Sequence, residues 1–239
     1  QIDHHGFLWM STEKGLYSIA LGTFEVSFFE KKWMPYGVDR QGNMWFGTPT
    51  GLAQFKVQKN DFQEFTLKEK SEVNGICQGR GPLLLVKNKD HLFSFDTQKQ
   101  VFEQLPASSD LMNSALVMAS DSAGLLWLSR WYNKENGLVY YDPYEDRILR
   151  SFGADARGMG STDCNDICVD GDQVWLATNT SGLCRYSMRE DRFYCYPADD
   201  GHERGIGGNQ LGRLSKDAFG NLWIASPIAL YKAPVHPQA

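Results

Sequence analysis

The sequence predicts an all-β protein, specifically a β-propeller of four-stranded antiparallel blades. Three observations predict this fold: one motif recurs along the chain, each copy reads as short strands divided by turns, and the copies are spaced as blades are. The clearest copy is 39–52, in which Asp39-x-x-Gly42 precedes an apolar run around Trp45. The central position recurs at residues 9, 45, 84, 127, 175 and 223, with Trp everywhere except at Leu84. Repeats roughly 36 to 48 residues apart are typical of solenoids, propellers and arrays.

The second repeat shows why each copy reads as strands. Residues 44–47 form a short apolar run, the pattern of a strand covered on both faces, and 52–57 and 62–65 follow as further strands. Gly42, Pro49 and Gly51 mark the turns between them. Four antiparallel strands with apolar residues on both faces are typical of a propeller blade. We place the Trp on the second strand and predict that four of these residues are buried between blades: Trp45, Trp127, Trp175 and Trp223.

The chain is expected to form a single domain, 1–239, with blades at roughly 1–29, 30–66, 67–105, 106–152, 153–197 and 198–239. Only Gln1 and Ile2 remain of the first strand of the first blade, and the last blade ends after a third strand at 229–232. The third blade is degenerate, with strands expected at 83–86, 92–95 and 101–105. Exposed strand edges are a liability, so the blades are expected to belong to a larger ring or to lack terminal residues.

Composition argues against several classes of function. The 239 residues carry a net charge of −5 and a pI near 5.6, which argues against nucleic-acid binding because that needs a basic face. No apolar run approaches the roughly 18 residues of a membrane-spanning helix. Five cysteines fit no metal spacing, since Cys164-x-x-x-Cys168 has no second half. No metal and no cofactor is expected.

The pattern Asp-x-x-Gly-x-Leu-Trp-x-Gly-Thr-x-x-Gly-Leu resembles the two-component regulator propeller repeat. That repeat fills the sensor region of hybrid two-component sensor kinases of Bacteroides-type bacteria. The resemblance covers nearly the whole chain, although His91 and Ala229 replace the later Gly in two copies. Five copies keep the Trp and four keep that Gly, at Gly15, Gly51, Gly137 and Gly182.

The resemblance implies a periplasmic propeller, usually seven-bladed and paired, that senses a carbohydrate or its breakdown product. Such a propeller signals through a membrane helix to a kinase, so membrane contact is expected only through parts outside these residues. The implied partners are an oligosaccharide or other small ligand, and a neighbouring propeller or the remaining blades of the full-length sensor. A homodimer is kept as a further alternative.

Long connections gather at one end of the blades, where function usually sits on a rigid scaffold. Connections between blades and turns between second and third strands share that end, because the strands are antiparallel. The insertion 129–136 therefore provides the leading ligand-binding candidates, a sugar-stacking and hydroxyl-binding set of Arg130, Trp131, Tyr132, Asn133 and Lys134. The alternative is that Trp131 packs on an adjacent loop. Further candidates are Trp33 and Tyr36, although Pro35 between them suggests a structural turn, and His202 and Arg204 in the connection 197–209.

A second set of polar residues precedes the first strand of four blades. It consists of Asn74, Asn113, Asn165 and Asn209. Such residues could surround the axis of a ring, but Asn side chains commonly satisfy turn backbone. We favour the architectural interpretation.

Enzymatic signals are weak, and we expect no catalytic residue. The five histidines form no Ser-His-Asp or His-metal spacing, and 199–204 lacks the alternating carboxylates of a calcium loop. The preferred hypothesis is an extracytoplasmic ligand-sensing module of a hybrid two-component sensor. The alternatives are a protein-interaction propeller without a small ligand and an enzyme like streptogramin lyase. For the lyase, His202 is the only histidine that we place on the long-loop end.

The fifth blade contains two cysteines that are expected to face each other. A four-residue turn at 188–191 pairs Ser187 with Arg192 and therefore Cys184 with Cys195. Directly opposed residues have Cβ atoms about 4.5–5.5 Å apart, close to the roughly 3.5–4.5 Å that a disulfide needs. An oxidising periplasm would permit the bond. Two free, half-buried thiols are the alternative.

Overall fold

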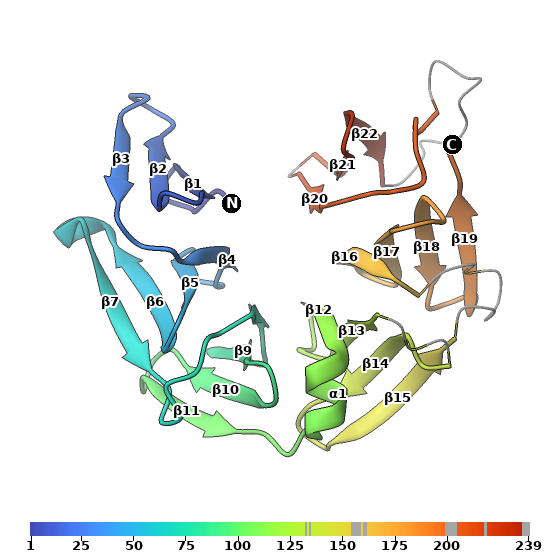
Figure 1. Ribbon diagram of the computed structural model, residues 1–239, viewed down its shortest axis with the longest axis horizontal. Helices are drawn as coiled ribbons and strands as arrows, with labels where there is room; N and C mark the ends of the chain where they lie inside the picture. The colour runs from blue at the N-terminus through green and yellow to red at the C-terminus, as the bar shows by residue number, and fades with distance from the viewer. Residues whose placement is uncertain are drawn as a thin grey trace. The chain divides into compact units, whose positions relative to one another are not determined.

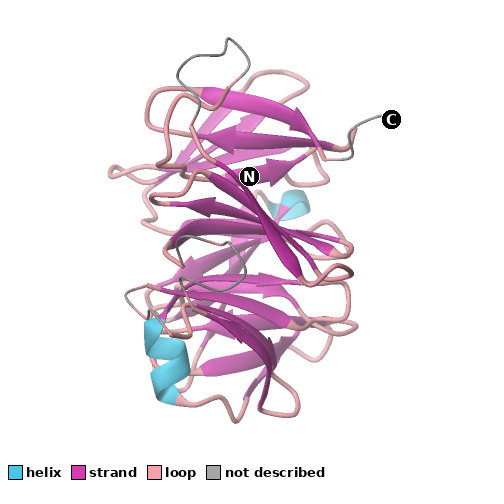
Figure 2. Cartoon of the chain, turned by 90° about the vertical axis from the view of Figure 1, so that its right-hand side faces the viewer, coloured by secondary structure: helices cyan, strands magenta, loops and turns pink. Residues whose placement is uncertain are grey.

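The computed structural model describes residues 1–131, 133, 135–153, 159, 162–198, 205–217 and 219–235. In these ranges the chain consists of strands and turns, with one α-helix, α1 (Ser109–Ser114), and one 3-10 helix, η1 (Val57–Lys59) (Figure 2). None of the helices in the described ranges has the length and apolar character that a bilayer span requires. The chain divides into two compact units, Gln1–Asn113 (unit 1) and Ser114–Ala239 (unit 2), and each is described by itself.

Unit 1 contains three antiparallel sheets in its described residues, and each takes its strands in chain order. They are β1 (Phe7–Ser11), β2 (Leu16–Ala20) and β3 (Val26–Phe29); β4 (Met34–Val38), β5 (Met44–Thr48), β6 (Gly51–Lys56) and β7 (Asp61–Thr66); and β8 (Gly75–Gln78), β9 (Leu83–Lys87), β10 (Leu92–Asp96) and β11 (Val101–Gln104). The first strands of neighbouring sheets lie beside one another, β1 with β4 and β4 with β8 (Figure 1).

Unit 2 repeats this arrangement. Its sheets are β12 (Ala115–Ser120), β13 (Leu126–Arg130), β14 (Leu138–Asp142) and β15 (Arg147–Phe152); β16 (Cys164–Asp170), β17 (Gln173–Thr178), β18 (Leu183–Ser187) and β19 (Arg192–Tyr196); and β20 (Leu214–Lys216), β21 (Asn221–Ala225) and β22 (Leu230–Pro234). The first strand β12 contacts β16, and β16 contacts β20.

The six sheets are the blades of a β-propeller, which confirms the predicted fold class. Four sheets have four strands, and the first and last have three. The first blade keeps only an isolated bridge between Ile2 and Leu8 in place of its first strand. Within the described residues β22 has no fourth strand beside it. Both gaps lie where the sequence predicts them.

The Asp of the repeat holds the turn after the first strand and also fixes the Trp. Asp39 Oδ1 accepts hydrogen bonds from the backbone N–H groups of Gln41 and Asn43, each at 2.9 Å. Its Oδ2 accepts from Trp45 Nε1 at 2.8 Å. A buried indole N–H needs such a partner. The same bond joins Asp3 to Trp9 and Asp217 to Trp223, at 2.9 and 3.0 Å.

Two blades of unit 2 lose this bond, since Trp127 Nε1 and Trp175 Nε1 have no hydrogen-bond partner among the described residues. In the fourth blade Asp121 Oδ2 instead accepts from the Tyr140 hydroxyl at 2.7 Å. The Tyr140 ring stacks on Trp127 with centroids 4.7 Å apart. In the fifth blade the turn is one residue shorter, so Asp170 does not reach the indole of Trp175.

The Asp–Trp bond makes a pH-dependent contribution to stability that can be tested at Asp217. Burial opposes ionisation of this carboxyl, but hydrogen bonds from Asn221, Trp223 and Phe219 outweigh it and lower the pKa to about 2. Because the folded pKa lies below the unfolded one, the contribution is present above about pH 4 and is lost as the pH falls toward 2. We expect Asp217→Asn to lower the melting temperature at pH 6 and to lower it less at pH 2.5, measured by circular dichroism. Equal differences at both pH values would contradict this assignment.

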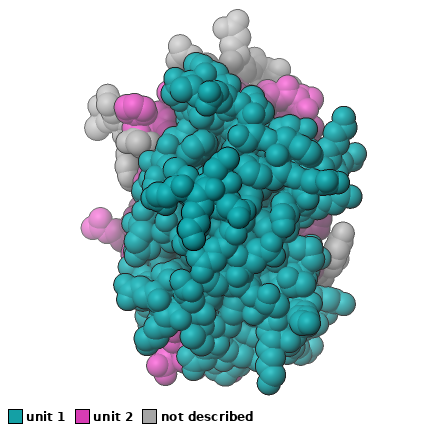
Figure 3. All heavy atoms as spheres, turned by 90° about the vertical axis from the view of Figure 1, so that its left-hand side faces the viewer, with its two compact units in different colours: residues 1–113 teal, residues 114–239 magenta. Residues whose placement is uncertain are grey.

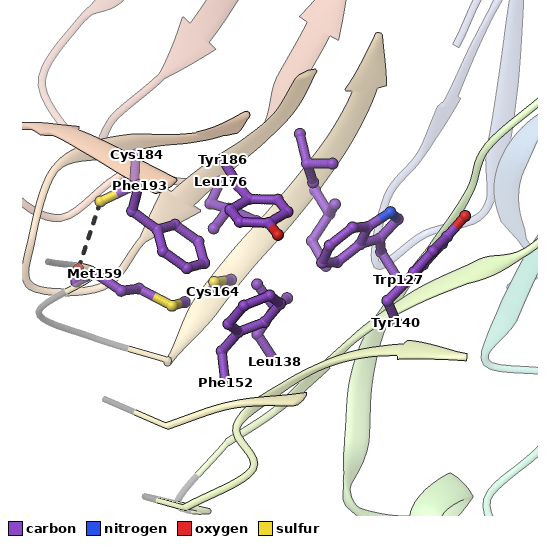
Figure 4. Packing of buried hydrophobic residues seen from close by; sticks show 12 residues of the cluster. Trp127, Leu138, Tyr140, Phe152, Met159, Cys164, Leu176, Cys184, Tyr186 and Phe193 are labelled. Carbon is purple, nitrogen blue, oxygen red and sulfur yellow. Dashed lines mark hydrogen bonds between the residues drawn. The ribbon is translucent and has the colours of Figure 1, made fainter. Parts of the chain in front are cut away.

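Within each unit, a blade packs its Trp side against the opposite side of the next blade. In unit 1 the Trp9 ring lies 5.0 Å from Phe46 and 4.7 Å from Phe55 of the second blade, and Figure 3 shows one continuously packed face of this unit. In unit 2 Trp127 and Phe152 meet Tyr186 and Phe193 of the fifth blade (Figure 4).

The predicted burial is confirmed for Trp45, Trp127 and Trp175, which are 2%, 0% and 6% exposed. It is wrong for Trp223, which is only partly buried. Its indole lies on the outer side of the last sheet, where Lys232 Nζ sits 5.4 Å from the ring centroid. No described sheet of unit 2 follows to cover it.

The Trp position of the third blade is Leu85, not Leu84 as the sequence suggests. The Gly79 N–H donates to the Leu83 carbonyl at 2.8 Å, as the Asp39 N–H of the second blade donates to the Asn43 carbonyl at 3.0 Å. Leu83 therefore takes the place of Asn43, and Leu85 takes the place of Trp45. The positive-φ glycine of this turn, Gly81, lies four residues before Leu85, whereas in the first, second, fourth and sixth blades the turn glycine lies three residues before the Trp. A prediction that counts strand positions from this glycine is therefore displaced by one residue. It assigns each side chain of the strand to the wrong face of the sheet.

Three features of the connections emerge only from the structure. In the last blade the first strand is β20, and Leu211 ahead of it is fully buried. Helix α1 occupies part of the connection before the fourth blade, and it buries Leu111 and Met112. Strand β4 begins at Met34, so Tyr36 lies in the sheet and not in the connection.

Candidate functional site

The insertion after β13 provides the best-defined polar and aromatic group at the long-loop end of unit 2. Trp131 is partly buried, and its Nε1 donates a hydrogen bond to the Cys164 carbonyl at 2.8 Å. Arg130 Nε donates to Ser114 Oγ at 2.7 Å. Ser129 Oγ accepts from the Cys164 N–H at 3.2 Å. The bonds of Ser129 and Trp131 to Cys164 hold the insertion against the first strand of the fifth blade.

The insertion is closed by a turn that includes a third candidate. Asn133 Oδ1 accepts from the Asn136 N–H at 2.9 Å, and Asn133 N–H donates to the Arg130 carbonyl at 3.3 Å. A Cβ at Gly137 would lie 2.1 Å from Thr162 Cβ, so only glycine lets this turn approach the next blade so closely. The turn therefore links the backbone of Asn133 to that of Arg130. Tyr132 and Lys134 lie outside the described residues.

The contact of Trp131 with Cys164 is the packing arrangement that the sequence offered as an alternative to ligand binding. The two interpretations are compatible, because the bond uses the indole N–H and the ring is only partly buried.

The two candidates of the second blade, Trp33 and Tyr36, pack against neighbouring side chains of the fold. Trp33 is 5% exposed, and its ring meets Phe62 edge-on at 5.1 Å. Tyr36 occupies a β-bulge of β4 and packs against the cluster of Trp45 and Val73. A Cβ at Gly47 would lie 2.6 Å from the Tyr36 ring, which explains the small residue there. The ring of Trp33 is therefore not available to a ligand in this structure.

His202 and Arg204 lie outside the described residues. In unit 1, His91 lies in the turn between β9 and β10, where its backbone N–H donates a hydrogen bond to Asn88 Oδ1. No group of three or more His, Cys, Asp or Glu residues suited to a metal occurs in the described part of the chain.

The repeated asparagines take architectural roles where their bonds are defined. Asn165 Nδ2 donates to the Leu211 carbonyl at 2.6 Å, and Asn209 Oδ1 accepts from the Ala198 N–H at 2.6 Å. Asn74 Oδ1 accepts from Lys87 Nζ at 3.0 Å. Burial lowers the pKa of Lys87 to about 8. Asn113 is exposed on α1.

Two free thiols lie beside the insertion, on β16. Burial raises the pKa of Cys164 to about 12 and that of Cys168 to about 11. Both thiols are therefore protonated at neutral pH, and neither has the thiolate character of a nucleophile or metal ligand. Asp166 on the same strand accepts a hydrogen bond from Leu214 N–H at 2.9 Å, and burial raises its pKa.

The predicted opposition of Cys184 and Cys195 is confirmed by the register of β18 and β19. The two residues form a disulfide, with Cα atoms 4.1 Å apart. The Met159 carbonyl oxygen lies 3.6 Å from Cys184 Sγ, the distance dashed in Figure 4, and 3.3 Å from Cys195 Sγ. A disulfide sulfur has no proton to donate, so these are close contacts. These contacts place the connection before the fifth blade against the hairpin of β18 and β19.

A shallow, open depression of about 480 Å³ lies beside the first blade. Its lining consists of Met10, Thr12, Glu13, Lys14 and Tyr17. It is too open to enclose a small ligand in the way that binding pockets usually do.

Comparison with solved structures shows what the fold resembles. The chain superposes with a TM-score of 0.73 on the extracellular domain of the hybrid two-component system assigned as BT3049 in B. thetaiotaomicron, at 22% identity over 94% of this chain. A second such domain, from BT4673 of the same organism, gives a TM-score of 0.68 at 17% identity over 97% of this chain. The chain spans 31% and 32% of those two proteins, about a third of their length.

An enzyme shares the fold as well. Virginiamycin B lyase from Staphylococcus aureus gives a TM-score of 0.68 at 15% identity, with 100% of this chain and 84% of the lyase covered. No protein-family model and no curated protein sequence matches the chain. At these identities the likeness establishes the fold, which hosts unrelated functions.

Proposed function

We propose that this chain is part of an extracytoplasmic ligand-sensing propeller of a two-component signalling system, and that its ligand is a carbohydrate or a carbohydrate breakdown product. The observation that carries the proposal is the likeness of nearly the whole chain to extracellular domains of two Bacteroides two-component systems. The repeat motif independently resembles the propeller repeat of such sensors. The proposed location is the periplasm, and the proposed partners are the other parts of a longer sensor.

The proposed binding group is Arg130, Trp131 and Asn133, together with Tyr132 and Lys134. The Trp131 ring is held by its bond to Cys164, so little conformational freedom would be lost when a sugar stacks on it. The bond from Arg130 to Ser114 similarly fixes the orientation of the guanidinium of the preceding residue. An aromatic surface edged by a few convergent polar groups is how small-molecule sites are usually built.

The test is a glycan array probed with the purified chain, followed by calorimetric titration of the best ligand. We expect Trp131→Ala to weaken binding at least tenfold, about 1.4 kcal/mol, because the stacking surface is lost. Tyr17→Ala, which removes a partly buried aromatic ring of the first blade, is the matched control and should leave the affinity unchanged. Unchanged affinity in both Trp131→Ala and Tyr132→Ala would show that the site is wrong. Absence of binding to any glycan would reject the ligand class.

A lyase is the second candidate, favoured by the near-complete coverage of the Staphylococcus aureus enzyme. It requires a catalytic histidine at the long-loop end, and the chain offers His202 and His91. Turnover of a streptogramin B substrate followed by mass spectrometry decides it. Loss of turnover in His202→Ala or His91→Ala, with folding retained, would support a lyase, and no turnover by the unaltered chain would reject it.

A further inference from the structure

The chain contains two Asn-Gly pairs, and the fold places them in different surroundings. One is Asn74-Gly75, where β8 begins, and the other is Asn136-Gly137, at the end of the insertion after β13. An asparagine side chain reacts most readily with its own main chain when glycine follows, because glycine has no Cβ to hinder its backbone nitrogen. The surroundings of each pair therefore decide whether it reacts.

The reaction is an intramolecular cyclisation followed by hydrolysis. The glycine backbone nitrogen, once deprotonated, attacks the asparagine Cγ. The new bond joins that nitrogen to Cγ, the Cγ–Nδ2 bond breaks, and Nδ2 leaves as ammonia after taking up a proton. One water molecule then opens the resulting succinimide ring at either carbonyl, which yields aspartate or isoaspartate. The reacting atoms must be free to approach one another.

At Asn136-Gly137 the reacting atoms are free while the main chain around them is held. The Asn136 N–H donates to Asn133 Oδ1 at 2.9 Å, and the Gly137 carbonyl accepts from the Arg130 N–H at 2.6 Å. Within the described part of unit 2, neither the Asn136 side-chain amide nor the Gly137 N–H makes a hydrogen bond. Asn136 lies in a bend and is half-buried, so part of its surface is open to water.

The fold also requires the glycine of this pair. A Cβ at Gly137 would lie 2.1 Å from Thr162 Cβ and 2.6 Å from the Asn133 carbonyl oxygen. A bulkier residue, which would slow the cyclisation at Asn136, is therefore excluded by the close approach of the insertion to the residues that precede β16.

The sheet protects the other pair. Asn74 Oδ1 accepts from Lys87 Nζ at 3.0 Å, and the Asn74 N–H donates to the Lys87 carbonyl at 2.9 Å. Gly75 is buried and stands opposite Lys87 in the pairing of β8 with β9. The side chain of Asn74 can turn onto the Gly75 nitrogen only after this end of the sheet opens, and local opening costs free energy.

We propose that Asn136 is a site of spontaneous deamidation, which the fold favours over Asn74. The product carries a new carboxylate in the insertion, and isoaspartate also adds one carbon to the main chain ahead of Gly137. Because Gly137 fits so closely against Thr162, the longer main chain displaces the Gly137 carbonyl from the Arg130 N–H. Weaker glycan binding follows from this displacement, a consequence that rests on the proposed function.

The test is to age the whole protein at pH 8.5 and 37 °C and to analyse tryptic peptides by mass spectrometry against unaged protein. Peptide 135–147, in which Asn136 is the single asparagine, should show the replacement of NH₂ by OH. It should separate into aspartate and isoaspartate forms, the second of which isoaspartyl methyltransferase labels. Peptide 71–80, which contains Asn74, should react at least about tenfold more slowly. In urea the two peptides should react at similar rates, because the protection by the sheet is lost.

Two variants provide the controls. Asn136→Gln should abolish the signal in peptide 135–147, because glutamine would have to close a larger ring, and Asn74→Gln should leave that signal unchanged. Hydrogen exchange at the Arg130 N–H should become faster in the aged unaltered protein and stay slow in aged Asn136→Gln.

Absence of deamidation at Asn136 in the folded protein, when the same residue reacts in urea, would overturn the proposal. So would equal rates at Asn74 and Asn136 in the folded protein, since the fold would then not select between them. These measurements use no ligand, so their failure is distinct from a failure of the proposed glycan binding.

Discussion

Replacing Trp127 with alanine is expected to lower the free energy of unfolding by about 3–5 kcal/mol, the cost typical of truncating a buried aromatic residue. Trp127 is fully buried and stacks on Tyr140, and its ring lies 5.6 Å from Tyr186 of the next blade. Alanine would leave a cavity at the centre of the packing between two blades (Figure 4). Urea denaturation followed by tryptophan-independent far-ultraviolet circular dichroism measures the change.

Two further substitutions separate packing from hydrogen bonding at this position. Trp127→Phe should cost clearly less than Trp127→Ala, because it keeps most of the ring and removes an N–H that has no partner in the described residues. Trp223→Ala serves as the matched control and should also cost less, since that indole is only partly buried. If Trp223→Ala were as destabilising as Trp127→Ala, inter-blade burial would not be the source of the effect.

Loss of the Cys184–Cys195 disulfide is expected to cost about 3 kcal/mol, the value that loop-closure entropy gives for a loop of this size. The bond joins residues separated by 11 positions and also contacts the Met159 carbonyl oxygen. The melting temperature should therefore fall when the protein is reduced. The double variant Cys184→Ala, Cys195→Ala should melt at the temperature of the reduced protein.

As a control, the melting temperature of the double variant should not change when reductant is added. The remaining cysteines, Cys77, Cys164 and Cys168, are free thiols. Thiol counting in denaturant without reductant should find these three, and all five cysteines after reduction. Five free thiols before reduction would show that the bond does not form.

Local features of the fold were predictable because they depend on residues close together in the sequence. The turn at 188–191 determines the register of β18 and β19, and that register places Cys184 opposite Cys195. The six-residue spacing of Asp39 and Trp45 is long enough to close a turn and return the carboxylate to the indole. The third blade was misplaced by one residue because its turn glycine, Gly81, is shifted, and no local signal distinguishes Leu84 from Leu85.

The candidate site was only partly predictable for a different reason. The sequence identifies aromatic residues in connections but not which of their faces the neighbouring blade covers. Trp33 and Trp131 both read as loop aromatics, yet Trp33 meets Phe62 in the core and Trp131 donates to Cys164.

The sequence by itself determined the repeat, the fold class and the opposition of the two cysteines across their hairpin. Each of these follows from periodicity or from a hairpin, where chain connectivity fixes the neighbours. Only the tertiary structure decided that Trp223 is partly exposed, that the Asp121 carboxylate accepts a hydrogen bond from Tyr140, and that Arg185 Nε has no acceptor among the described residues. These features depend on which side chains of different strands or blades meet in space, and the local sequence pattern does not determine that.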